Sequence, residues 1–184
     1  MSMQLDKVQP KNKIQLEQLI GYAFKHNIYD LNFIDTSKIT NMSNLFANCE
    51  YDIDVSNWDV SNVTNMYNMF FCCQNFNSDL SNWNVSNVTD MYSMFIACEN
   101  FKGKGLENWD VSNVKDIGSM FAGCENFNCD LSNWDMSNVT DMGYAFIDCE
   151  KFKGKGLENW NVINVTSMRH MFDGCNKLTI PDWY

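Results

Sequence analysis

The chain has 184 residues, 45% of them hydrophobic, and it carries 13 Lys and Arg against 23 Asp and Glu. This length and composition suffice for one continuous core, so we expect a single ordered domain. The net charge of −10 repels a phosphate backbone and an anionic membrane surface, and no apolar run approaches the length that spans a bilayer. We therefore predict no nucleic-acid partner and no membrane insertion.

The first predicted element is an amphipathic helix over residues 11–27. It follows Pro10, and its apolar residues fall largely on one helical face: Ile14, Leu16, Leu19, Ile20, Ala23 and Phe24. We predict that residues 1–33 form an N-terminal helical cap over the open core of the segment that follows. The residues before the helix do not have a cationic region followed by an apolar one, so the chain as written predicts no export signal.

A tryptophan-anchored sequence recurs through the rest of the chain. The stretch W-D-V-S-N-V-T-N-M that begins at Trp58 returns with small edits at Trp83, Trp109, Trp134 and Trp160, in steps of 25, 26, 25 and 26 residues. A period of this size indicates units that must stack on a neighbour to bury their apolar face. With Ile34 in the tryptophan position of the first unit, the sequence predicts six coils: 34–57, 58–82, 83–108, 109–133, 134–159 and 160–184.

Within one coil the apolar period changes. The alternation around Trp83 and Val85 is typical of a short strand, whereas Val88, Met91 and the residues after them follow a helical spacing that suits one or two turns of α or 3₁₀ helix. One strand and one short helix per coil is the plan of a leucine-rich repeat, with a parallel sheet on the concave face. Equivalent Trp and Met residues are predicted to stack in the core rather than to form a ligand site.

The pattern L-S-N-W-D-V-S-N-V-T-x-M-x-x-M-F-x-x-C-x-x-F resembles the BspA-like leucine-rich repeats. In particular it resembles the DUF285 subgroup of mycoplasmal, spirochaetal and other bacterial surface proteins, which is also met in giant DNA viruses. The resemblance covers residues 28–178. It implies an α/β repeat fold, a right-handed solenoid, used for adhesion or protein binding at a cell surface, with no catalytic activity.

A second period lies over the first. Residues 74–124 and 125–175 align without a gap, with 34 of 51 positions identical, and each copy contains F-K-G-K-G-L-E-N-W. The unit that duplicated was therefore a pair of coils. The Gly-Lys-Gly corners place four lysines on one side of an otherwise acidic chain: Lys102, Lys104, Lys153 and Lys155. Near the end of the chain, Pro181 removes a backbone donor and is expected to blunt the last sheet edge.

Six cysteines occupy one position of the repeat: Cys49, Cys73, Cys98, Cys124, Cys149 and Cys175. Side chains at equivalent positions point the same way, so we predict reduced core thiols, with disulfides or a metal site as the alternatives. Cys72 and Cys129 lie outside this column and are interpreted as incidental surface or half-buried thiols rather than as a redox pair. So much unpaired sulfur favours a reducing, intracellular or virion-internal setting, whereas the family resemblance favours the cell surface. We predict no metal and no cofactor.

Three outward positions of each predicted strand form columns on the concave face. The residues of these columns that we predict to bind a partner are Asn57, Asp59, Ser61, Asn82, Asn84, Ser86, Asn108, Asp110, Ser112, Asn133, Asp135, Ser137, Asn159 and Asn161. Two interpretations stay open: side-chain hydrogen-bond ladders that keep the sheet hydrated, or a face that binds a basic or polar partner. Calcium binding is the weaker alternative, because one carboxylate per coil supplies too few oxygens.

The two histidines, His26 and His170, stand at opposite ends of the repeat array, and no catalytic constellation can be assembled around either. We therefore predict no catalytic residues. The leading hypothesis is a non-catalytic protein-binding or adhesion module whose partner is a host or assembly protein. The alternative is a structural or assembly component of a virion or cytoplasmic complex, which uses the solenoid ends and the Lys-Gly corners as contacts.

Overall fold

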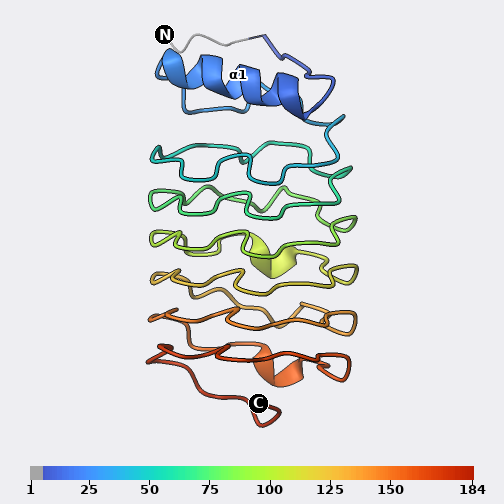
Figure 1. Ribbon diagram of the computed structural model, residues 1–184, viewed down its shortest axis with the longest axis vertical. Coiled ribbons are helices and arrows are strands. Elements are labelled where there is room, and N and C mark those ends of the chain that lie inside the picture. The colour runs from blue at the N-terminus through green and yellow to red at the C-terminus, as the bar shows by residue number, and fades with distance from the viewer. Residues whose placement is uncertain (1–5) are drawn as a thin grey trace.

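The computed structural model describes residues 6–184, which wind into a stack of similar coils with the helix α1 (Lys13–Lys25) at the N-terminal end (Figure 1). Residues 1–5, part of the predicted N-terminal cap, lie outside the described range. The other helices are the 3₁₀ helices η1 (Leu106–Asn108) and η2 (Leu157–Asn159). In this range β-pairing consists of isolated parallel bridges, and no helix is long and apolar enough to cross a membrane.

Helix α1 begins where a side chain satisfies a backbone donor. The Oδ1 atom of Asn12 accepts a hydrogen bond from the N–H of Gln15 at 3.0 Å, which caps the first turn. The face that the sequence predicts to be apolar packs on the core through three buried residues: Leu16, Ile20 and Ala23. Ile14, which we expected on this face, is instead 66% exposed. The helix therefore adds its buried face to the core of the stack.

The backbone of each coil alternates between two kinds of hydrogen bond. In the second coil, the N–H groups of Met66, Asn68 and Phe70 donate to carbonyls of the third coil at 2.9–3.1 Å. The intervening N–H groups of Met69 and Phe71 instead close turns within their own coil. The same alternation recurs in the first five coils. Since alternate donors of this stretch bind the neighbouring coil, each of these coils depends on the next for its backbone hydrogen bonds.

Two positions in every coil adopt left-handed backbone, with φ between 53° and 76°. The first position holds Asn44, Asn68, Ser93, Ser119, Tyr144 and His170, and the second holds Asn48, Cys72, Ala97, Gly123, Asp148 and Gly174. A right-handed helix cannot continue through such residues. The spacing that suits a short helix after each tryptophan therefore forms linked turns here. The two 3₁₀ helices lie elsewhere, directly after the Gly-Lys-Gly corners.

Two parallel bridges lie near the N-terminal end, Val8 with Ile34 and Asp30 with Asp54, and the other bridges among residues 6–184 form one column along the stack. It joins Asn41, Asn65, Asp90, Asp116, Asp141 and Ser167, which are equivalent residues of successive coils. This column lies seven residues after the tryptophan position, not in the stretch around the tryptophan where the alternation suits a strand. There the chain turns instead: the N–H of Trp58 donates back to the carbonyl of Val55 at 3.1 Å. The alternation of buried and exposed residues around the tryptophan therefore arises without an extended ladder.

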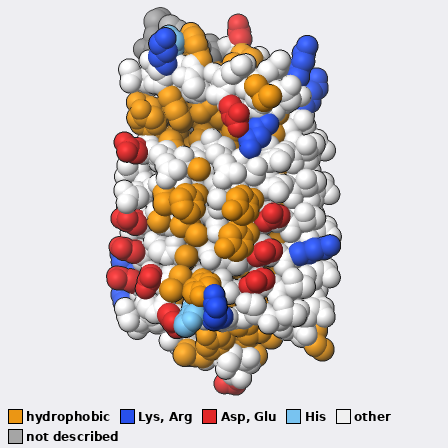
Figure 2. All heavy atoms as spheres, viewed as in Figure 1, with side chains coloured by type: hydrophobic (Ala, Val, Ile, Leu, Met, Phe, Trp, Pro, Cys, Tyr) orange, Lys and Arg blue, Asp and Glu red, His pale blue; other side chains and the backbone are white. Residues whose placement is uncertain are grey.

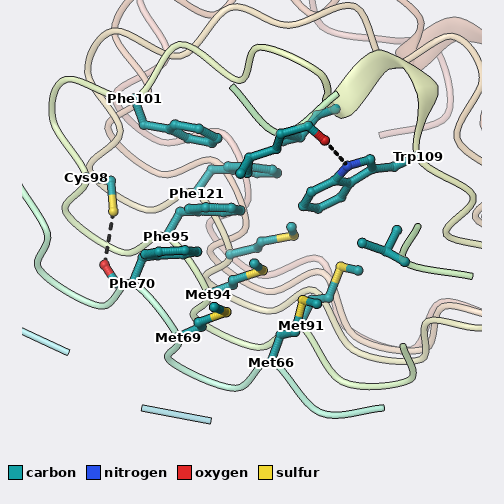
Figure 3. Close-up of a cluster of buried hydrophobic side chains, with 14 of the residues drawn as sticks. Met66, Met69, Phe70, Met91, Met94, Phe95, Cys98, Phe101, Trp109 and Phe121 are labelled. Carbon is teal, nitrogen blue, oxygen red and sulfur yellow. Dashed lines mark hydrogen bonds between the residues drawn. The ribbon is translucent and has the colours of Figure 1, made fainter. Parts of the chain in front are cut away.

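Stacked side chains fill the interior (Figure 3). One phenylalanine per coil stacks on its equivalent in the next with centroids 5.4–5.9 Å apart, in the order Phe46, Phe70, Phe95, Phe121, Phe146 and Phe172. Fully buried methionines lie beside them, among them Met66, Met69, Met91 and Met94. Truncating a buried aromatic residue costs about 3–5 kcal/mol, so this continuous column supplies much of the stability of the stack.

Every tryptophan in the chain also donates a hydrogen bond to a backbone carbonyl 26–29 residues earlier in the sequence. The indole Nε1 of Trp134 donates to the carbonyl of Leu106 at 2.8 Å, and equivalent bonds run from Trp58, Trp83, Trp109, Trp160 and Trp183 at 2.7–3.3 Å. Trp183 thus takes the tryptophan position of a further partial coil beyond Pro181. Among residues 6–184, no buried side-chain nitrogen or oxygen lacks a hydrogen-bond partner.

Candidate functional site

The predicted partner-binding residues form three adjacent columns, which we call the Asn/Asp/Ser face. All of its Asn and Asp side chains are exposed, whereas its serines, Ser61, Ser86, Ser112 and Ser137, are half-buried. Its aspartates are held by local turns: Oδ1 of Asp59 accepts the N–H of Ser61 at 3.0 Å. The same turn forms at Asp110 and Asp135. Within residues 6–184 the Oδ2 atoms of these three aspartates accept no hydrogen bond.

The asparagine column of this face is only partly engaged in bonds between coils. The amide of Asn82 donates to Oδ1 of Asn57 at a long 3.4 Å, and the amide of Asn133 donates to the carbonyl of Glu107 at 3.0 Å. No side-chain hydrogen bond forms at Asn108 or Asn159 within the described residues. The face is therefore a set of fixed carboxylates beside a column of partly free amides.

A regular amide ladder lies next to this face, at a position that the sequence shows only as a recurring Asn-Val. The Nδ2 atoms of Asn62, Asn87, Asn113, Asn138 and Asn164 donate to a serine carbonyl of the preceding coil at 2.6–2.9 Å. These carbonyls belong to Ser37 and to the serine column of the face. A side-chain hydrogen-bond ladder was one of our two interpretations of the Asn/Asp/Ser face. Such a ladder forms mainly at this neighbouring asparagine position instead. The recurrence of asparagine at this position, in five of six coils, was the signal for it.

The bridge column brings three aspartates of consecutive coils together, a feature that we did not anticipate. Asp90, Asp116 and Asp141 are half-buried. Burial raises the pKa of Asp116, and the neighbouring carboxylates of Asp141 and Asp90 raise it further, against a lowering bond from the N–H of Gly118. In the part of the chain that the structure describes, no group of three or more His, Cys, Asp and Glu side chains is placed to hold a metal ion.

The cysteines of the core column are free, and they act as hydrogen-bond donors. The Sγ atoms of Cys73, Cys98, Cys124, Cys149 and Cys175 donate to a phenylalanine carbonyl of the preceding coil at 2.9–3.0 Å. Burial raises the pKa of the Cys73 thiol to about 12. Protonated thiols suit this arrangement, because only the protonated form can donate.

Six lysines in or near the corners separate into two sets. Lys104 and Lys155 form ion pairs with Asp79 and Asp130, at 2.6 and 2.5 Å. The bonds to these lysines and to nearby serines lower the pKa of both aspartates to about 2. The second set lines a surface hollow of about 460 Å³ together with Asn126 and Asn128. It consists of Lys102, Lys151, Lys153 and Lys177. Lys151 and Lys177 are members that the corner motif does not reveal.

The histidines occupy separate surroundings. His170 pairs with Asp173 at 2.7 Å and stacks on Tyr144, whereas Nδ1 of His26 bonds the backbone carbonyl of Tyr22. Within residues 6–184 neither imidazole bonds a Ser, Thr or Cys side chain. A hydroxyl or thiol nucleophile activated by an adjacent histidine would need such a bond.

Coils joined by the same backbone and side-chain bonds from one to the next define a repeat protein. A family model described as "Mycoplasma protein of unknown function, DUF285" matches residues 14–105 and again residues 94–183. The chain belongs to this DUF285 family. Comparisons with curated proteins and with solved structures find no match. The family description names no activity.

Proposed function

We propose that this chain is a non-catalytic protein-binding or adhesion module of the BspA-like leucine-rich-repeat type. In this proposal the stack is a right-handed solenoid, and the Asn/Asp/Ser face binds a basic or polar segment of a protein partner. The observation that carries the proposal is the row of exposed carboxylates at Asp59, Asp110 and Asp135, each fixed by a turn through one oxygen with the other oxygen unbonded among the described residues.

Fixed side chains favour binding because less conformational entropy is lost when a partner docks. Each of these aspartates is already held by the N–H two residues later, so its carboxylate is oriented before the partner arrives. The net charge of −10 would also speed the approach of a basic partner and repel an acidic one. Both effects support a basic protein segment as the ligand.

A triple variant with a matched control tests this proposal. Asp59→Asn, Asp110→Asn and Asp135→Asn together remove three charges but keep the turn oxygen, and Asn84 and Asn161 already occupy this position in other coils. The control, Glu50→Gln, Glu125→Gln and Glu150→Gln, removes three exposed charges outside the face. Proteins captured by the wild type and the control but lost by the aspartate variant would be the partners. Equal capture by all three proteins would contradict the assignment of this face.

The second candidate is a structural or assembly component that uses the stack ends and the lysine corners. The sixth coil favours it: the N–H groups of Met168, His170, Phe172 and Gly174 have no acceptor among residues 6–184. Equivalent groups of earlier coils all donate to the next coil, so these four groups are placed to pair with a further coil or an assembly partner. Ile163, in the same coil, is 82% exposed. Recovery of the protein only from the exterior of intact cells, with its cysteines oxidised, would contradict this candidate.

A further inference from the structure

The second set of lysines lies in one hollow on the side of the stack. We propose that the hollow lined by Lys102, Lys151, Lys153 and Lys177 binds a compact polyvalent oxyanion, a small ligand that carries two or more phosphate or sulfate charges. The hollow contains no residue of the Asn/Asp/Ser face. This second site is therefore independent of the proposed binding at the Asn/Asp/Ser face and can fail or succeed separately.

The repeat fixes the backbone from which these lysines extend. The N–H of Lys102 donates to Oδ1 of Asn77, and the N–H of Lys153 donates to Oδ1 of Asn128, each at 3.1 Å and each one coil back. The N–H of Lys151 likewise binds a carbonyl of the preceding coil. The four lysines belong to the third, fifth and sixth coils, with the asparagines of the fourth coil between them. The alternation of Lys and Asn at equivalent positions thus builds the rim of the hollow.

The charge of the hollow is uncompensated. Within residues 6–184, none of its four lysine nitrogens has a carboxylate oxygen within 4.0 Å, although Lys104 and Lys155 nearby are both paired. The adjacent glutamate column, Glu99, Glu125 and Glu150, contributes nothing to the lining. Four exposed ammonium groups in a chain with net charge −10 repel one another, and a bound anion of two or more charges would relieve that repulsion.

The polar groups that line the hollow favour a ligand that only accepts hydrogen bonds. A lysine ammonium has three donors and no acceptor. The ammonium of Lys151 donates one hydrogen bond to Oδ1 of Asn126 at 2.5 Å, and the amide of Asn126 itself donates to the carbonyl of Glu99. The remaining ammonium donors and the Asn128 amide have no acceptor among the described residues. Phosphate and sulfate oxygens accept such bonds, and lysine binds them as a point charge. A volume of about 460 Å³ suits a small ligand.

Isothermal titration of the full chain at low ionic strength tests the proposal. The probes are inorganic phosphate, pyrophosphate and tripolyphosphate, and affinity is expected to rise along this series. Lys102→Gln with Lys153→Gln should weaken tripolyphosphate binding by about tenfold or more, as the loss of charge-assisted bonds would. Binding should also fall as salt is raised, because the site is exposed.

The matched control is Lys38→Gln with Lys115→Gln, two exposed lysines outside the hollow that change the net charge equally. It should retain wild-type affinity, and both double variants should keep the wild-type melting temperature. A sulfated disaccharide of equal charge forms a second arm: tighter binding of the phosphate series assigns a free polyphosphate, and tighter binding of the sugar assigns a sulfated glycan. No detectable binding of tripolyphosphate, or equal loss in both double variants, would overturn the proposal.

Discussion

The thiol of Cys98 donates a hydrogen bond to the backbone carbonyl of Phe70, one coil earlier, at 3.0 Å (Figure 3). Burial raises the pKa of this thiol well above its ordinary value. Because the thiolate is the reactive form, we predict that iodoacetamide at pH 8 leaves Cys98 unmodified in the native protein and modifies it once urea unfolds the chain. Half-buried Cys72 should react first. Peptide mass spectrometry reads both sites, and rapid native labelling of Cys98 would contradict the donor role.

The tryptophan bonds predict a graded loss of stability. Trp109→Phe keeps a large apolar ring but removes the indole donor to the Leu80 carbonyl, which retains the N–H of Trp83 as a donor. The free energy of unfolding should therefore fall by about 0.5–1.5 kcal/mol, the net value of one hydrogen bond. Trp109→Ala should cost about 3–5 kcal/mol and reduce the cooperativity of thermal unfolding across neighbouring coils. Tyr22→Ala, at an exposed position of α1, serves as the control and should have little effect. Unchanged unfolding of the alanine variant at Trp109 would refute the stacked core.

The left-handed backbone positions predict opposite effects on stability when glycine replaces either of two nearby alanines. Ala97 has φ 53°, and Gly123 occupies the equivalent position one coil later. Ala97→Gly should therefore raise the free energy of unfolding by about 1 kcal/mol, through relief of the left-handed strain. Ala122 is also half-buried, but its φ is not in the left-handed region. Ala122→Gly should therefore lower the free energy of unfolding by about 0.5–1 kcal/mol. Denaturant titration of both variants measures the difference, and a loss of stability for Ala97→Gly would count against this backbone.

The aspartates of the bridge column predict that removing one carboxylate charge increases stability in a pH-dependent way. The folded pKa of Asp116 lies above its unfolded value, so its charge destabilises the fold at neutral pH and the penalty disappears as the pH falls through that raised pKa. Asp116→Asn keeps the turn, as Asn65 does at the equivalent position, and should stabilise the protein at pH 7 by up to about 1 kcal/mol. The gain should vanish in acid. Melting temperatures across the acidic range measure it.

Asp130 supplies the control of opposite sign. Hydrogen bonds from Lys155 and Ser132 lower its pKa to about 2, so its contribution to stability is present above the unfolded pKa and is lost as the pH falls toward 2. Asp130→Asn should therefore lower the melting temperature at neutral pH, with the difference shrinking in acid. If Asp116→Asn and Asp130→Asn shifted stability in the same direction at pH 7, the electrostatic description of the column would be wrong.

Much of the stack can be read from the repeat, because equivalent residues recur at fixed positions. The tryptophan, phenylalanine and cysteine columns of the core, and a helix between residues 11 and 27, are all visible in the sequence. The linked turns are not, since left-handed positions hold residues as different as Ala97, Ser119 and Tyr144. Only the asparagines and glycines among them signal that conformation. The sequence therefore favours a helix where the chain instead forms turns.

The surfaces were harder to predict than the core, because they depend on which residues of adjacent coils meet. Lys102 and Lys104 lie in one motif, yet Lys104 pairs with Asp79 and Lys102 lines the hollow. Likewise, the aspartates that crowd one another belong to the bridge column at Asp116 and not to the predicted face. Such residues meet because each coil stacks on the one before it. The spacing of residues within a single coil does not reveal which residues of adjacent coils will meet.

The measurement that tests the central claim most directly is the affinity of a captured partner for three proteins. These are the wild type, the variant with Asp59, Asp110 and Asp135 changed to Asn, and the control with Glu50, Glu125 and Glu150 changed to Gln. The proposed binding face predicts that calorimetry finds affinity about tenfold or more weaker for the aspartate variant and near that of the wild type for the control. Equal affinity of both variants for the partner would contradict it.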